Sequence, residues 1–134
     1  MFLQALRQVA ALLGLALLPA FVSGAIQLQP NRANLAEVIS PAEVLASTVP
    51  IVWIDSRPQA AFDHGHATQA LLLNSEDWDR LIPPVLDAWH PDKLLVVYGD
   101  EFSTSETVAR RLRKEMQIKN VRALKGGWER WQAK

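Results

Sequence analysis

The stretch Leu94–Leu112, "LLVVYGDEFSTSETVARRL", decides the fold of this chain. It opens with an unbroken apolar run, which is typical of a strand buried on both faces of a sheet. A short polar loop follows, and then Val108, Leu112 and Met116 recur at the spacing of one buried helical stripe. A strand, a tight loop and a helix in this order place the loop at the helix N-terminus, where a functional site is often built.

Other short elements alternate on either side of this unit. The expected strands lie in "IVWID", "ALLLN" and "NVRAL", and "AEVIS" is a short apolar segment before the first of them. The expected helical turns lie in "SPAEVLAST", "PQAAFDHG", "SEDWDRLI" and "WERWQ". Ser40 and Pro41 are typical of a helix start, and Gly65 of a helix end. We expect Pro83–Pro84 to break or restart the helix that they follow. The alternation predicts an α/β fold with a mostly parallel central sheet and helices on both faces.

The start of the long helix carries a further signal. Ser103 and Glu106 are three residues apart and match a capping box, which predicts a helix beginning after Ser103.

Composition limits the possible functions. The chain has 134 residues, with 14 basic and 14 acidic side chains and no cysteine. A protein without a basic surplus has no electrostatic footprint for nucleic acid, so we expect no nucleic-acid partner. The lack of cysteine excludes disulfides, thiolate metal sites and thiol catalysis within this polypeptide.

The N-terminus differs from the rest of the chain. Arg7 precedes the uncharged stretch Val9–Ile26, which fits either a signal peptide or a membrane-anchoring helix. We favour the anchor because "SGA" is a poor cleavage site. Residues 1–26 are therefore assigned to the hydrophobic segment, 27–34 to a linker and 35–134 to the globular domain. Either interpretation places the domain outside the cytoplasm, either anchored to the membrane or exported after cleavage.

Three motifs in order carry a resemblance to a known family. They are "WIDSRPQAAFDHGHATQALLLN", the strand, loop and helix around Gly99, and "NVRALKGGWERW". From about Leu35 to Gln132 the chain resembles a rhodanese-like domain of the sulfurtransferase superfamily. The resemblance implies the three-layer rhodanese fold.

Active members of that family carry sulfur as a persulfide on a loop cysteine at a helix N-terminus. In this chain the cysteine position is Gly99, and Asp100 and Glu101 follow it. At roughly 5 Å and an effective dielectric near 20, each carboxylate repels one negative charge of thiosulfate by about 3 kcal/mol before screening. The resemblance therefore implies an inactive homologue with a vestigial loop, formed by Gly99, Asp100, Glu101, Phe102, Ser103, Thr104 and Ser105.

No other side chain is expected to replace the cysteine. Ser103, Thr104 and Ser105 are hydroxyl candidates, but hydroxyls at a helix start are usually caps and do not form persulfides. His64 and His66 lack a third ligand at metal-binding spacing, so we expect no metal and no cofactor.

The resemblance also assigns supporting roles. Asp55 and Arg57 are expected to brace the loop region from the end of the central strand, and His66 to bond the backbone at a turn.

Together these features predict a non-catalytic binding or docking module. Gly99 is expected to leave room at the base of the loop pocket, ringed by the backbone donors of Glu101–Ser105. The expected partners are an unidentified protein and a membrane, the latter through the N-terminal segment. The alternative is thiosulfate or persulfide sulfurtransferase activity that relies on a partner's cysteine.

Overall fold

The computed structural model describes residues 37–132, apart from the side chain of Arg130. The chain divides into two units, Met1–Arg32 and Ala33–Lys134, and every described residue belongs to the second. The predicted N-terminal segment and linker lie outside the described residues. Within the described part, no helix has the length and apolar character needed to cross a membrane.

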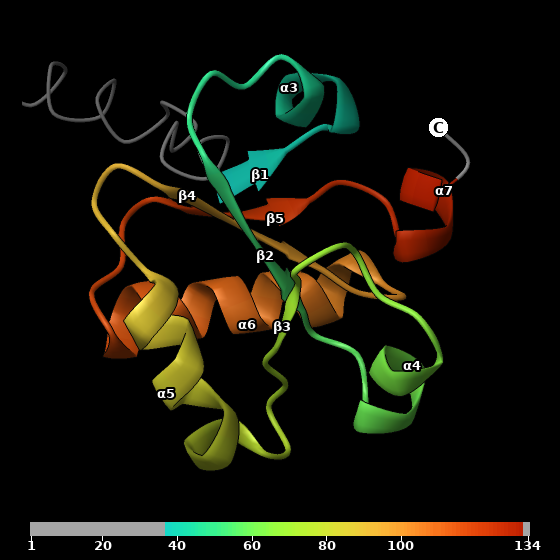
Figure 1. Ribbon diagram of the computed structural model, residues 1–134, viewed down its shortest axis with the longest axis vertical. Coiled ribbons are helices and arrows are strands. Elements are labelled where there is room, and N and C mark those ends of the chain that lie inside the picture. The colour runs from blue at the N-terminus through green and yellow to red at the C-terminus, as the bar shows by residue number, and fades with distance from the viewer. Residues whose placement is uncertain (1–36, 133–134) are drawn as a thin grey trace, which may run out of the picture. The chain divides into compact units, whose positions relative to one another are not determined.

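A five-stranded parallel sheet forms the centre of the domain (Figure 1). Its order is β1-β5-β4-β2-β3, so the long strands β2 and β4 lie side by side in the middle. The strands are β1 (Val38–Ile39), β2 (Ile51–Asp55), β3 (Leu71–Leu72), β4 (Leu94–Tyr98) and β5 (Val121–Leu124). The prediction of a parallel sheet with "LLVVY" at its core is confirmed.

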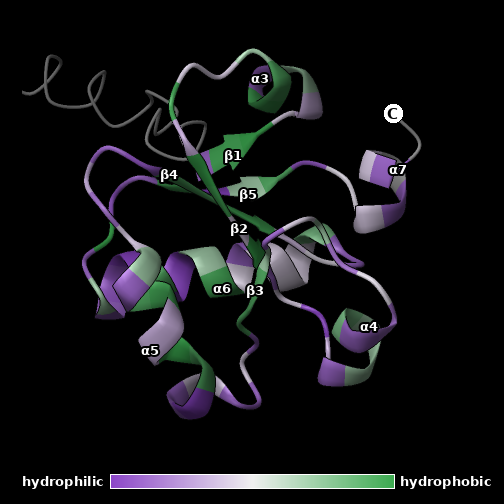
Figure 2. Ribbon diagram, in the orientation of Figure 1, coloured by the Kyte–Doolittle hydropathy of each residue, from purple (hydrophilic) through white to green (hydrophobic). Residues whose placement is uncertain are grey.

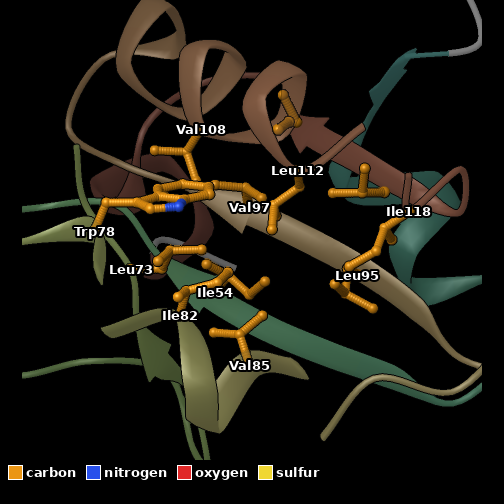
Figure 3. Close-up of a cluster of buried hydrophobic side chains, with 13 residues drawn as sticks. Ile54, Leu73, Trp78, Ile82, Val85, Leu95, Val97, Val108, Leu112 and Ile118 are labelled. Carbon is orange, nitrogen blue, oxygen red and sulfur yellow. The ribbon is translucent and has the colours of Figure 1, made fainter. Parts of the chain in front are cut away.

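Helices cover both faces of the sheet, as predicted. They are α3 (Pro41–Leu45), α4 (Gln59–His64), α5 (Trp78–Ala88), α6 (Phe102–Glu115) and α7 (Trp128–Gln132). Helices α5 and α6 bury one apolar cluster, in which Val108 and Leu112 face Ile54 and Val97 of the sheet (Figure 3). Side chains of α3, α4 and α7 cover the second cluster on the opposite face. Apolar strands lie between helices whose outer faces are polar, which gives the three layers (Figure 2).

Helix α6 confirms the predicted apolar stripe but not its predicted start. It begins at Phe102, so Ser103 lies within the first turn and is not the cap. The carboxylate of Glu106 pairs instead with Arg110 at 3.3 Å. Phe102 packs against the cluster beneath the helix, which explains why the helix includes it. The capping-box prediction was therefore wrong.

Helix α5 runs through the two prolines that were expected to break it. Two interior prolines cost a helix about 3 kcal/mol or more each. The helix buries Trp78, Ile82 and Val85, and full burial of one such side chain contributes about 1.5–3 kcal/mol. Burial of this face is of the same order as the penalty and holds the helix together across the exposed Pro83–Pro84.

Candidate functional site

The predicted nucleophile position, Gly99, lies directly after the central strand β4. Parallel pairing of Asp55 with Tyr98 brings Ser56, the residue after β2, beside it. The Ser56 hydroxyl donates a 2.7 Å hydrogen bond to the carbonyl oxygen of Tyr98. A β-carbon built on Gly99 would lie 2.6 Å from that hydroxyl oxygen, closer than packed atoms approach. A side chain at position 99 would therefore fit only if the Ser56 hydroxyl moved, so Ser56 limits the expected room at the base of the loop pocket.

The double glycine near the C-terminus lets a second loop pack against this one. Gly126 has a φ of 90°, a conformation that favours glycine. A β-carbon on Gly127 would lie 2.5 Å from the carbonyl oxygen of Asp100. The Trp128 N–H donates a 2.9 Å bond to the carbonyl oxygen of Gly99. The turn before α7 thus closes on the backbone of the β4–α6 loop.

Three acidic residues line one hollow where these loops touch. Asp100, Glu101, Gly127 and Glu129 line a hollow of about 450 Å³, which we call the acidic hollow. Sequence reasoning found the first two acids and missed Glu129, because only the tertiary packing of α7 brings it to the loop. The only signal in the sequence was the family-like "GGWE" that follows β5.

The remaining loop residues divide between surface and core. Ser103 and Thr104 are exposed at the start of α6. Phe102 is tucked against the apolar cluster, and the buried Ser105 hydroxyl donates to the Phe102 carbonyl oxygen at 2.9 Å. The Ser105 N–H makes a long 3.5 Å bond to the carbonyl oxygen of Glu101. None of these hydroxyls contacts a base among the described side chains, so the arrangement provides no activated nucleophile.

Beneath the loop lies a buried polar network. Arg57 and Asp55 form an ion pair at 2.7 Å, and both side chains are almost wholly enclosed. The Tyr98 hydroxyl donates to the Asp55 carboxylate at 2.8 Å and accepts the Ala67 N–H at 3.0 Å. Tyr98 was read from the sequence only as a strand residue. Its position in the last place of β4 connects the network to the loop.

The network shifts the titration of two of its members. Burial raises the pKa of the Tyr98 phenol above its ordinary value, with its hydrogen bond to Asp55 adding to the effect. The hydrogen bond to Asp55 raises the pKa of Arg57. The guanidinium also donates to the Gly65 carbonyl oxygen at 2.5 Å and lies 5.1 Å from the centre of the Trp128 ring. Arg57 therefore joins the end of α4 to the start of α7.

His66 lies at the turn after α4. Its Nδ1 is 2.8 Å from the carbonyl oxygen of Phe62, and its ring stacks on the Phe62 ring at 3.8 Å. Within residues 37–132, no group of three or more histidine or acidic side chains is placed to hold a metal ion. The histidine pair thus has no further ligand in the described part of the chain.

These features agree with a comparison against known protein families. The family described as "Rhodanese-like domain" matches residues 40–134. The chain belongs to the rhodanese-like domain family. Its fold is that of the family, and the chain contains no cysteine.

Solved structures show the same rhodanese-like fold. The rhodanese-like domain of an Anabaena protein is 20% identical with a TM-score of 0.57, over 72% of this chain and 74% of that one. A Lactobacillus plantarum protein is 21% identical with a TM-score of 0.56, covering 83% and 92%. A rhodanese-related protein from Thermoplasma volcanium is 13% identical with a TM-score of 0.54, covering 72% and 91%. Among curated proteins, no match was found.

Proposed function

We propose that this rhodanese-like domain is catalytically inactive and binds a protein partner through the surface around its acidic hollow. The proposal places the domain on the outer side of a membrane, and the apolar stretch Val9–Ile26 supports that location. The partner contributes a positively charged group to the contact.

The packing around Gly99 is the main observation that supports the loss of activity. The chain has no thiol, and the space for a side chain at this position is taken by the Ser56 hydroxyl. A site that had lost only its nucleophile would retain a gap beside the loop. Here the neighbouring strand supplies an atom to that gap and bonds it to Tyr98.

The charge of the loop surface supports the kind of partner. Asp100 and Glu101 are exposed, and with Glu129 they line one hollow. Such a surface repels thiosulfate and attracts cationic side chains, and the attraction is stronger at low ionic strength. A domain that keeps the rhodanese-like scaffold, with a loop that attracts cations rather than anions, is suited to binding a protein partner.

Sulfur transfer is the first test. The full chain is incubated with thiosulfate and cyanide, and separately with a persulfide donor, and then analysed by mass spectrometry. We expect no thiocyanate above the buffer rate and no covalent sulfur adduct. Turnover by the isolated chain would refute inactivity, and turnover only when a cysteine-bearing partner is added would favour the borrowed-thiol alternative.

Partner capture tests the binding surface. The tagged full chain and its Asp100→Asn/Glu101→Gln variant are used to capture proteins from detergent-solubilised membranes of the source cells. The matched control is Glu76→Gln/Asp79→Asn, which neutralises two exposed acids that line a different hollow. We expect the loop variant to lose partners that the control retains. Equal capture by both variants would argue against the acidic hollow as the contact.

A further inference from the structure

The edge of β2 is only partly covered. Strand β3 pairs with β2 at Ile54 and Asp55 alone, while β4 pairs with all five residues on the other side. Ile51–Trp53 therefore present an open sheet edge, which we call the edge notch. In Figure 1, β3 lies beside one end of β2 only.

The hydrogen-bonding groups of β2 alternate between its two neighbours. The Pro50 carbonyl oxygen accepts the Leu94 N–H at 2.9 Å, and the Ser56 N–H donates to the Tyr98 carbonyl oxygen at 2.9 Å. In a parallel ladder, alternate residues direct both groups to the same side. Pro50, Val52, Ile54 and Ser56 thus face β4, and the residues between them face the edge.

Three of these edge-facing groups have no partner among the described residues. Asp55 is bonded, because its carbonyl oxygen accepts the Leu73 N–H at 2.9 Å. No bond to another described residue outside the ladder involves the N–H or C=O of Ile51 or the N–H of Trp53, and β3 does not extend to them. Gln69, with a φ of 63°, turns the chain away before it can pair. Backbone groups at such an edge bond to water or to an added strand.

A hollow of about 540 Å³ opens at the same place. Its walls include the apolar Ile51, Trp53 and Leu71. Lys93 is the one charged residue that lines it, and no carboxylate is among its described lining residues. The opening therefore combines apolar walls, free backbone groups and a single positive charge.

We propose that the edge notch binds an extended peptide segment of a partner protein, which adds as a short strand beside β2 and carries a carboxylate that pairs with Lys93. This goes beyond the proposed function, because the notch lies at the amino end of β2 and the acidic hollow follows the carboxyl end of β4. The two surfaces differ in charge and select different partners.

The backbone geometry supports an added strand. Strands pair at about 4.7–4.9 Å, and main-chain bonds supply affinity without requiring a particular sequence. The N–H and C=O of Ile51 and the N–H of Trp53 supply two donors and one acceptor to such a strand. Specificity comes from an apolar side chain of the peptide against Trp53 and from the charge of Lys93.

Synthetic peptides provide the probe. The full chain in mild detergent is titrated with a pool of acetylated octapeptide amides, randomised among valine, threonine, tyrosine and serine around one fixed glutamate. A second pool carries lysine in place of glutamate. We expect the glutamate pool to bind and the lysine pool to bind several-fold more weakly, as expected for one partly exposed charge pair. Amide exchange should slow at Ile51 and Trp53 in the complex and not change at Val52.

Paired variants separate the backbone from the side chain. Ile51→Pro removes an N–H that faces the notch at the first position of a strand, where proline is tolerated. Ile51→Ala shortens the same side chain and keeps the N–H. Loss of one hydrogen bond should make Ile51→Pro bind about fivefold more weakly than Ile51→Ala. Lys93→Gln should reduce the preference for the glutamate pool.

A test on the peptide side does not depend on the folding of any variant. A selected peptide is N-methylated at alternate positions in two separate syntheses. We expect binding to be lost only in the series that blocks the peptide N–H groups facing β2. Equal loss in both series, no binding by either pool at about 1 mM peptide, or occupation of the notch by a second copy of the chain would each overturn the proposal.

Discussion

The side-chain oxygen of Ser56 lies 2.6 Å from the point that a β-carbon at Gly99 would occupy. The two residues follow adjacent parallel strands, and the register of those strands sets their distance. A side chain at position 99 would therefore require the Ser56 hydroxyl to move, so substitutions at the two positions should be coupled.

Replacement of Gly99 by alanine should destabilise the domain. The backbone of Gly99 does not adopt positive φ, so the penalty comes from overpacking against Ser56, at about 1–3 kcal/mol. In a Ser56→Ala background the penalty should be smaller by about 1 kcal/mol. Urea denaturation of the two single variants and the double variant measures this coupling. If the two substitutions change the free energy of unfolding additively, the Ser56 hydroxyl does not limit the space at position 99.

A cysteine placed at position 99 should be fully active only when the Ser56 hydroxyl and the two loop acids are also replaced. We expect Gly99→Cys alone to transfer sulfur from thiosulfate poorly, and Gly99→Cys with Ser56→Ala to do better. Adding Asp100→Asn/Glu101→Gln should raise the rate roughly fivefold at low salt, because it removes about 1 kcal/mol of screened repulsion. The measurement is thiocyanate formation over a range of ionic strength. A rate that does not change when the two acids are neutralised would contradict their proposed role.

Alkaline pH should destabilise the fold through Tyr98. Burial raises the pKa of this phenol, whereas the unfolded chain titrates near its ordinary value of about 10. Below that pH both states hold the proton. Above it the unfolded state loses the proton first, so the free energy of unfolding falls by up to about 1.4 kcal/mol per pH unit.

This effect has a direct readout, because Tyr98 is the one tyrosine in the chain. Tyrosinate absorbance should appear together with loss of the helical circular dichroism signal, and not before it. The Tyr98→Phe variant should lack the part of the fall in the free energy of unfolding at alkaline pH that is due to the phenol. Tyrosinate formation in the folded protein near pH 10 would show that the phenol is not protected.

Loss of the Asp55 carboxylate should strongly destabilise the domain. Asp55→Asn leaves the enclosed guanidinium of Arg57 without its counter-charge, which typically costs about 3–5 kcal/mol. The double variant Asp55→Asn/Arg57→Gln should be more stable than the sum of the single effects predicts. Thermal and urea unfolding of the two single variants and the double variant tests this. Strictly additive losses of stability would show that Asp55 and Arg57 do not stabilise the fold as a pair.

The sequence predicted much of the fold because local signals were strong. Ser40 and Pro41 begin α3 as expected, and the Ser40 hydroxyl accepts the Glu43 N–H at 3.2 Å. Gly65 ends α4. The predictions failed where burial outweighed local preference. The apolar face of α5 carried the helix through Pro83–Pro84, and packing of Phe102 moved the start of α6.

The candidate site divides in the same way. Sequence reasoning identified Gly99, Asp100 and Glu101, since they are consecutive in a recognisable motif. It missed Glu129 and the closing role of Ser56, which come from other segments. Side chains that meet only through strand register and loop packing leave no periodic pattern in the sequence.

By itself, the sequence determined that this protein has no thiol and that its apolar strands and striped helix form an α/β sheet domain, because residue identity and hydrophobic periodicity are local properties. Only the tertiary structure decided that the Ser56 hydroxyl lies against Gly99, that Glu129 joins the loop acids and that β3 leaves Ile51–Trp53 of β2 uncovered. Those facts depend on which distant segments pack together, and distance in space is fixed by the fold as a whole.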